Sequence, residues 1–318
     1  MPQVVGFKQQ LENNLDRLSA LAETFNRNLM QLQKGEFSCS YRNSDGTANI
    51  LSCNTIGGPS ILIGPVSADG KIVVGCLRGN STGYIDGKEI SSSKAFIGGE
   101  HAIRNIVLPV NASIDLCFAP VSRLSTYSDD TDNIAPKGDR FIVIDKPSCL
   151  DFYVKAVFGG ENDCVGPSSG KALERQFFTE IADICKKSEA LQFRLNDRAL
   201  LFSRSISLLF EAPFAYRNSA DLAKVVHCSV RTIEKTFKSI LKMTPGALIR
   251  AIQLNTFRQT VIERSRKKRT VLANIANELG VINYSRFSKN YTEFFGENPR
   301  ATSIGSRKNF LTHKAKND

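Results

Sequence analysis

The sequence contains few of the residues that enzymes and metal sites need most. Only three histidines occur, His101, His227 and His313, so little imidazole is available for metal binding or acid–base catalysis. Eight cysteines are scattered without a CxxC pair, which favours small, buried, reduced thiols over a zinc site or a disulfide framework. GxSxG and P-loop motifs are also missing. We therefore expect no catalytic residues, no metal, no cofactor and no enzymatic activity.

Long apolar segments are missing as well. No stretch approaches the length of a membrane span, and Met1–Gln10 lacks the basic start and apolar run of a signal peptide. These absences predict a cytoplasmic protein without a membrane partner. A hydrophobic content of 42% and a charged content of 23% are typical of globular proteins, and 318 residues favour two domains.

The charge of the chain is concentrated in its last third. Residues 214–318 carry 20 Lys and Arg against 7 Asp and Glu, whereas residues 1–213 carry 22 against 24. A solvated basic surface would explain the high isoelectric point but not this segregation. A nearly neutral region joined to a strongly basic one indicates that the basic part has an anionic partner.

The N-terminal region begins with a helical pattern and continues as short strands. Leucines spaced three to four apart predict an amphipathic helix over 11–34. Short apolar runs separated by Gly and Asp turns, among them Asp86-Gly87, predict a β-barrel or sandwich from about 35 to 150. The apolar runs are Ile61–Ile63, Ile72–Leu77, Ile114–Phe118 and Phe141–Ile144.

Helical patterns return after Gly170. Leu173, Phe177, Ile181 and Ile184 form one apolar stripe, which favours core packing, with a dimer interface as the alternative. A second helix is expected over about 195–211.

The last third contains an internal repeat. In the first copy Ile233 is followed after three residues by Phe237 and after seven more by Pro245. The second copy repeats the spacing with Phe287, Tyr291 and Pro299. Each copy predicts two short helices joined by a tight turn, which is the pattern of a helix-turn-helix unit.

Particular residues fit the turns and helix starts of this repeat. Ala223 and Ala276 are small residues where the two helices of each unit would pack, and Gly280 suits the second turn. Ser229 and Asn283 are expected to be the N-caps of the two recognition helices. Thr244-Pro245 predicts the start of a long helix between the units.

Residues 219–303 resemble the DNA-binding domain of the AraC (AraC/XylS) family of transcription regulators. The similarity of the first half rests on Leu222-Ala223, Ser229, Arg231, Ile233, Phe237-Lys238 and Thr244-Pro245. That of the second half rests on Ile275-Ala276, Gly280, Ser285-Arg286-Phe287-Ser288, Tyr291, Phe295-Gly296 and Pro299. Leu254–Arg258 and Phe295–Pro299 resemble the subgroup that contains the ethanolamine-operon regulator. The sequence departs from the family pattern at four positions. Gln253 replaces an arginine, Phe257 a small residue, Val281 an aromatic residue and Met243 a glycine.

The resemblance implies double-stranded DNA as the partner, with side chains of both recognition helices contacting it. If Ile233 and Phe237 face the core of the first unit, helical geometry turns other side chains outward. The expected DNA-contacting residues are Arg231, Glu234, Lys235, Lys238, Tyr284, Ser285, Arg286 and Lys289. Arg and Lys suit guanine edges, Glu234 a cytosine amine and Tyr284 a thymine methyl, while Lys238 suits phosphate. Arg266, Lys267 and Lys268, in a basic loop between the units, are candidate phosphate contacts.

The strand-rich region resembles the cupin-like sensor domain that precedes this DNA-binding domain in many relatives. The similarity is clearest over Leu77–Glu89, with Gly79, Gly83 and Asp86-Gly87 in a hairpin pattern. A metal cupin needs several closely spaced histidines, and this region contains only His101. A metal enzyme with an accessory DNA-binding tail is therefore the remote alternative.

The sequence thus predicts an α+β protein of two domains. We expect a cupin-like sensor or dimerisation domain over 1–170, linking helices over 171–213, the double helix-turn-helix domain over 214–305 and a basic tail over 306–318. The expected function is sequence-specific transcription regulation, activating by family precedent, with RNA polymerase, a small-molecule effector and a second copy of the chain as partners. A dimeric regulator that needs no ligand is the alternative.

Overall fold

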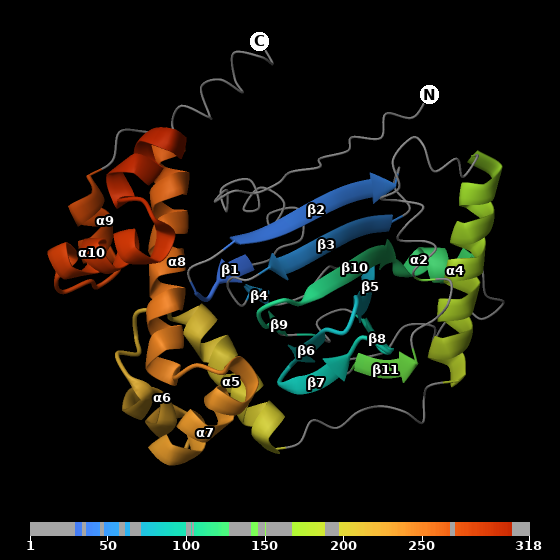
Figure 1. Ribbon diagram of the computed structural model, residues 1–318, viewed down its shortest axis with the longest axis horizontal. Coiled ribbons are helices and arrows are strands. Elements are labelled where there is room, and N and C mark those ends of the chain that lie inside the picture. Colours follow the sequence, from blue (N-terminus) through green and yellow to red (C-terminus); the bar gives the residue numbers. More distant parts are fainter. Residues whose placement is uncertain are drawn as a thin grey trace, which may run out of the picture.

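The computed structural model describes residues 29–33, 36–44, 48–56, 61–63, 71–99, 103, 105–126, 141–145, 150, 167–187, 197–267 and 271–306. Within these ranges, the N-terminal half consists mainly of strands and the C-terminal half of helices, as predicted (Figure 1). The strands are β1 (Leu29–Gln31), β2 (Glu36–Ser44), β3 (Ala48–Ile56), β4 (Ile61–Ile63), β5 (Lys71–Leu77), β6 (Thr82–Ile85), β7 (Lys88–Ser91), β8 (Lys94–Gly98), β9 (Ile106–Leu108), β10 (Ser113–Pro120) and β11 (Phe141–Asp145).

The described strands form two antiparallel sheets. One has the order β1-β4-β9-β6-β7 and the other the order β11-β8-β5-β10-β3-β2. All four apolar runs of the sequence lie in strands, namely β4, β5, β10 and β11. The Asp86-Gly87 pair forms the two-residue turn between β6 and β7, and both residues have positive φ, as a tight hairpin turn requires.

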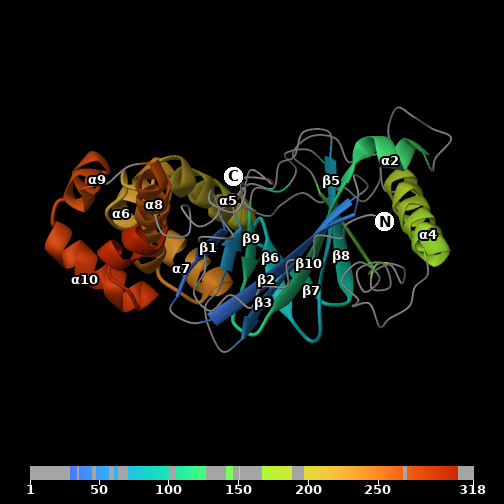
Figure 2. The same cartoon turned by 90° about the horizontal axis from the view of Figure 1, so that it is seen from above.

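Strand β5, in the middle of the six-stranded sheet, is buried on both faces. On β5, Val73 and Leu77 point to one face and Ile72, Val74 and Cys76 to the other, and all of them are buried. The outer face is covered by α2 (Val121–Thr126) and α4 (Pro167–Lys187), which lie beyond that sheet in Figure 2. Because both faces are covered, β5 is a continuous apolar run rather than an alternating one.

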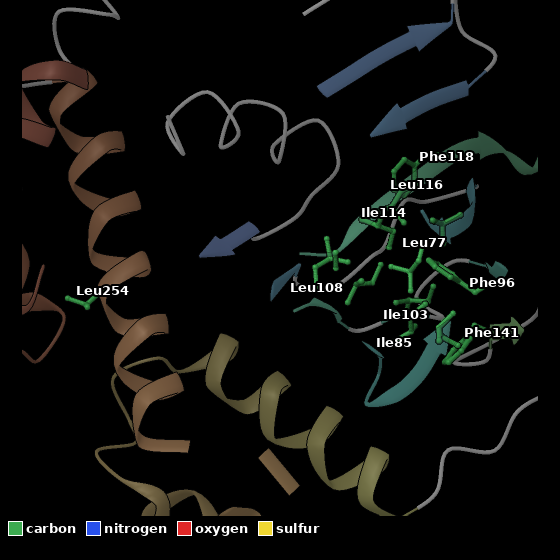
Figure 3. Packing of buried hydrophobic residues seen from close by; sticks show 14 of the residues in the cluster. Leu77, Ile85, Phe96, Ile103, Leu108, Ile114, Leu116, Phe118, Phe141 and Leu254 are labelled. Carbon is green, nitrogen blue, oxygen red and sulfur yellow. The ribbon is translucent and has the colours of Figure 1, made fainter. Parts of the chain in front are cut away.

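The space between the two sheets is a closely packed apolar core. Leu77, Ile85, Phe96 and Leu116 from both sheets belong to it (Figure 3). A side chain at Gly75 would meet the Phe96 ring at 2.1 Å, so glycine leaves the space that this ring fills. The two sheets remain separate among the described strands, so of the barrel and the sandwich that the sequence left open, the structure has the sandwich. Closure depends on pairing between distant strands, which local strand patterns do not specify.

The stripe on α4 is core packing over its described side chains. Phe177 and Ile181 are fully buried against the outer face of the six-stranded sheet, and the rings of Phe177 and Phe178 make an edge contact at 5.2 Å. Cys185 also belongs to this cluster, and burial raises the pKa of its thiol to about 12. The apolar face of α4 is thus used within the chain.

The helix predicted over 11–34 is wrong at its C-terminal end. Leu29–Gln31 is strand β1, paired antiparallel with Ile61–Ile63 of β4. This pairing offers the backbone a sheet ladder, which outweighs the local helical spacing. The rest of the predicted helix lies outside the described residues, as does the basic tail beyond Ser306.

The C-terminal helices form a separate group on the other side of the sandwich from α4 (Figures 1 and 2). They are α5 (Asp197–Glu211), α6 (Ser219–Val225), α7 (Val230–Leu241), α8 (Pro245–Lys267), α9 (Leu272–Glu278) and α10 (Tyr284–Phe295). Residues 299–306 add a last helical segment. No helix in the described ranges combines the length and the apolar character needed to cross a membrane.

Helix α5 lies between the sandwich and the helical group. A side chain at Gly87 would come within 2.9 Å of the Ala199 backbone, so the β6–β7 turn rests directly on α5. The ring of Phe202 on the same helix packs against that of Phe237 on α7, with 5.3 Å between the ring centres. One helix therefore touches both the strand-rich domain and the first helix-turn-helix unit.

Candidate nucleic-acid interface

The first helix-turn-helix unit consists of α6 and α7. The turn between them holds His227 at φ 55°, and the Cys228 amide donates to the Ala223 carbonyl at 3.0 Å. Ser229 caps α7, as predicted, because its Oγ accepts a hydrogen bond from the Thr232 amide at 3.0 Å. The start of α7 is thereby fixed by its own cap and by the turn before it.

The second unit repeats this geometry in α9 and α10. Gly280 takes φ 80° in the turn, and the Val281 amide donates to the Ala276 carbonyl at 2.9 Å. Asn283 caps α10, also as predicted, by accepting from the Arg286 amide at 2.9 Å. The internal repeat of the sequence is therefore a repeat of structure.

The long helix α8 joins the two units. It begins at Pro245, and the Thr244 hydroxyl accepts from the Ala247 amide at 3.2 Å. Gln253, which replaces a family arginine, donates to the carbonyls of Pro213 and Tyr216 at 3.1 and 3.2 Å. The position that departs from the family pattern thus ties α8 to the segment before α6.

Aromatic rings fill the interface between α8 and α10. Phe257 is fully buried, and its ring lies 5.2 Å from that of Phe287 and 5.8 Å from that of Tyr291. Val281, another departure from the family pattern, packs partly buried against the same cluster. The large residue at 257 therefore contacts several rings of α10 at once.

The side chains predicted to face DNA lie mostly on the exposed surfaces of α7 and α10. Ile233 and Phe237 are fully buried, as the helical spacing requires. The exposed residues of the predicted set are Arg231, Glu234, Lys235 and Lys238 on α7, and Ser285, Arg286 and Lys289 on α10. Each recognition helix therefore presents basic side chains beside its capped N-terminus.

Tyr284 lies differently from the rest of the predicted set. It is half-buried, its ring lies 6.3 Å from that of Phe257, and burial raises the pKa of its hydroxyl. Its position at the first turn of α10 brings it against α8 rather than fully outward. Only part of the Tyr284 ring is therefore exposed for the predicted contact with a thymine methyl group.

A buried ionic group that the sequence did not reveal holds α10 from behind. Arg258 is 4% exposed, forms an ion pair with Glu297 at 2.6 Å and donates to the Tyr291 hydroxyl at 3.1 Å. Thr302, in the last helical segment, lies 2.8 Å from the same hydroxyl and donates to Glu297 at 2.8 Å. The guanidinium also lies 4.7 Å from the centre of the Phe295 ring. The signal available was a charged residue four positions after Leu254, on the apolar face of α8.

The basic segment between the units is helical where the structure describes it. Residues 264–267 form the last turn of α8, not a loop. Arg264 pairs with Glu278 of α9 at 2.5 Å, and the buried Ser265 hydroxyl lies 2.7 Å from that of Ser303. These contacts favour continuation of the helix. Arg266 is partly exposed, the side chain of Lys267 is not described, and Lys268 lies outside the described residues.

Polar groups also join the strand-rich domain to the helices. Asp86, 3% exposed, accepts a hydrogen bond from the backbone amide of Asn105 at 2.8 Å. The Ser203 hydroxyl of α5 lies within 3.5 Å of the side chains of both residues. On the other side, Asn255 of α8 donates to the carbonyl of Gln31 in β1 at 2.8 Å. The sequence had given Asp86 only as a turn residue.

Residues 222–303 match the model of a helix-turn-helix domain family. The match covers both units described above, from Leu222 in α6 to the last helical segment. These residues form an AraC-type helix-turn-helix domain. The chain is thus a DNA-binding transcription regulator, whereas the ethanolamine-regulator subgroup suggested by the sequence is not confirmed.

Several solved structures resemble the chain distantly. ToxT from Vibrio cholerae O395 is 14% identical, with a TM-score of 0.30 over 87% of this chain and 96% of that one. The AraC-like transcriptional activator CuxR is 11% identical, with a TM-score of 0.37 over 86% and 98%. Wild-type ToxT with bound unsaturated fatty acid is 14% identical, with a TM-score of 0.29 over 87% and 94%.

Proposed function

We propose that the chain activates transcription by binding a specific DNA site through both α7 and α10. The observation that carries this is the repeated geometry of the two units, each with a capped helix whose exposed face carries arginine and lysine. Two such helices can enter successive major grooves about 34 Å apart on one side of the duplex. Each protomer then covers an asymmetric site of about two turns.

Arg231 and Arg286 carry the base contacts in this proposal. Both are exposed and lie in the first turn of their helices, where side chains of a recognition helix meet base edges. An arginine can donate two hydrogen bonds to a guanine. Lys238 and Lys289, further along the two helices, suit phosphates.

The strand-rich domain acts in this proposal as the sensor, or as the dimerisation unit, for the DNA-binding domain. Support comes from α5, which contacts the Asp86-Gly87 turn on one side and Phe237 of α7 on the other. A small molecule that binds the strand-rich domain would shift the populations of two placements of α5, and DNA affinity would change by the difference between them. RNA polymerase is the partner that activation requires.

Binding to the intergenic DNA upstream of its own gene, measured at several salt concentrations, tests the proposal. The wild-type chain should prefer this DNA to random duplex, with a steep loss of affinity as salt rises. Arg231→Ala combined with Arg286→Ala should abolish the preference and leave salt-dependent, non-specific binding. Lys94→Ala, which removes an exposed cation of the strand-rich domain, is the matched control and should behave as wild type. Equal affinity of the wild type for both DNAs would overturn the proposal.

A further inference from the structure

The turns of the two helix-turn-helix units differ in length by one residue. In each unit an amide in the turn donates to the carbonyl of the packing alanine, Cys228 to Ala223 and Val281 to Ala276. Ser229, the first cap, follows Cys228 directly, whereas Asn283 follows Val281 after one intervening residue. That additional residue is Ile282.

Ile282 is unusually exposed for a large apolar side chain. Its relative exposure is 84%, the highest among the described large hydrophobic residues, the next being Val271 at 61%. Val281 packs against the core before it, and Asn283 is held by its capping bond after it. Ile282 is therefore presented from a fixed turn, and a β-branched side chain has few rotamers to lose on contact.

The position of Ile282 in the chain determines which group of the DNA it could contact. It directly precedes the N-cap of α10, and Ser285 and Arg286 are exposed in the first turn after that cap. Side chains at the N-terminus of a recognition helix meet base edges in the major groove. Among the groups that bases display there, the 5-methyl of thymine is the apolar one.

We propose that Ile282 determines specificity in the second half of the DNA site by packing against a thymine 5-methyl group. This inference rests on the proposed function, because it requires α10 to enter the major groove. Burying one methyl group between two apolar surfaces strengthens binding about fourfold. The first unit has no counterpart of Ile282, so the preference for thymine belongs to the second half-site.

Uracil substitution tests the contact, since uracil differs from thymine only by lacking the 5-methyl. A preferred site is first selected from random duplex DNA with the wild-type chain. Each thymine of that site is then replaced by uracil in turn, and the Kd is measured for wild type, Ile282→Ala and Ile304→Ala. Ile304 is the matched control, an isoleucine 49% exposed in the last helical segment of the same domain.

The wild-type chain should bind the site about fourfold more weakly when one particular thymine of the second half-site is replaced by uracil. Ile282→Ala should bind the thymine site about fourfold more weakly and lose nothing further with uracil, because both changes remove the same contact. Ile304→Ala should keep the uracil sensitivity of the wild type. A wild type without any sensitive thymine, or an Ile282→Ala variant that keeps the sensitivity, would overturn the inference. If no site is selected, the proposed function itself fails, and the inference with it.

Discussion

Two turn residues of the DNA-binding domain hold their backbones in the left-handed region: His227 at φ 55° and Gly280 at φ 80°. Only glycine adopts this region without steric cost. The second turn was therefore predictable from Gly280, whereas a histidine in the same conformation gives no such signal. Steric crowding does not require glycine at position 280, since an added Cβ would meet nothing within 4 Å.

Gly280→Ala should accordingly lower the free energy of unfolding by about 1 kcal/mol, through backbone strain alone. His227→Gly, the matched change, should leave it within about 0.5 kcal/mol of wild type, since relieved strain offsets the greater entropy of unfolded glycine. Urea unfolding of the full chain measures both. Equal losses in the two variants would show that the turns do not share this conformation.

The buried tyrosine of α10 shows what periodicity reveals and what it leaves out. Spacing predicted that Tyr291 faces inward, and it is fully buried. For its partner Arg258 the only signal was a place on the apolar face of α8, because the groups that make its burial favourable, Glu297 and Thr302, come from later segments.

Burial raises the pKa of Tyr291 to about 12, which predicts a dependence of stability on alkaline pH. Below pH 10 the phenol is protonated in both the folded and the unfolded state, so it adds no pH dependence to stability. Between pH 10 and 12 the unfolded chain releases this proton and the folded chain keeps it, so stability falls as pH rises. Tyr291→Phe should show a shallower fall in urea unfolding measured from pH 9 to 11. Parallel curves for the two proteins would contradict this assignment.

At the scale of elements, strands were predicted best where they are most buried. Ile72–Leu77 is a continuous apolar run because both faces of its sheet are covered, and it appears as β5. Ile114–Phe118, apolar apart from the buried Asp115, appears as β10. Leu29–Gln31 was predicted as helix, because its partner strand β4 lies 30 to 34 residues further along the chain. Separation into two sheets depends on the same long-range pairing.

The contact between the β6–β7 turn and α5 can be measured with two glycines. Gly79 and Gly87 both have positive φ, but only at Gly87 would a side chain meet α5, at 2.9 Å from Ala199. Gly79→Ala should cost about 1 kcal/mol of stability and Gly87→Ala about 2–4 kcal/mol. Gly87→Ala should also weaken binding to the selected DNA site, because α5 contacts α7 through Phe202 and Phe237.

Urea unfolding and DNA titration of both full-length variants provide the measurement. If the two substitutions cost the same stability, the turn does not rest on α5. If only stability changes and DNA affinity does not, α5 does not couple the sandwich to the first unit.

At the scale of the whole molecule, the division of charge follows the division of structure. The nearly neutral part of the sequence builds the sandwich, and the basic last third builds the helical group that matches a helix-turn-helix domain. Charge and repeat were visible in the sequence, so the DNA-binding domain was predictable. The contacts between the domains, such as Asn105 to Ser203 and Asn255 to Gln31, were not, because they join residues about 100 to more than 200 positions apart.

The central claim is that α7 and α10 contact separate halves of one DNA site. Missing-base interference on the selected site, with wild type, Arg231→Ala and Arg286→Ala, tests it most directly. The account predicts two groups of sensitive bases about ten base pairs apart, one lost in Arg231→Ala and the other in Arg286→Ala. A single group of sensitive bases, or a wild-type pattern in both variants, would contradict it.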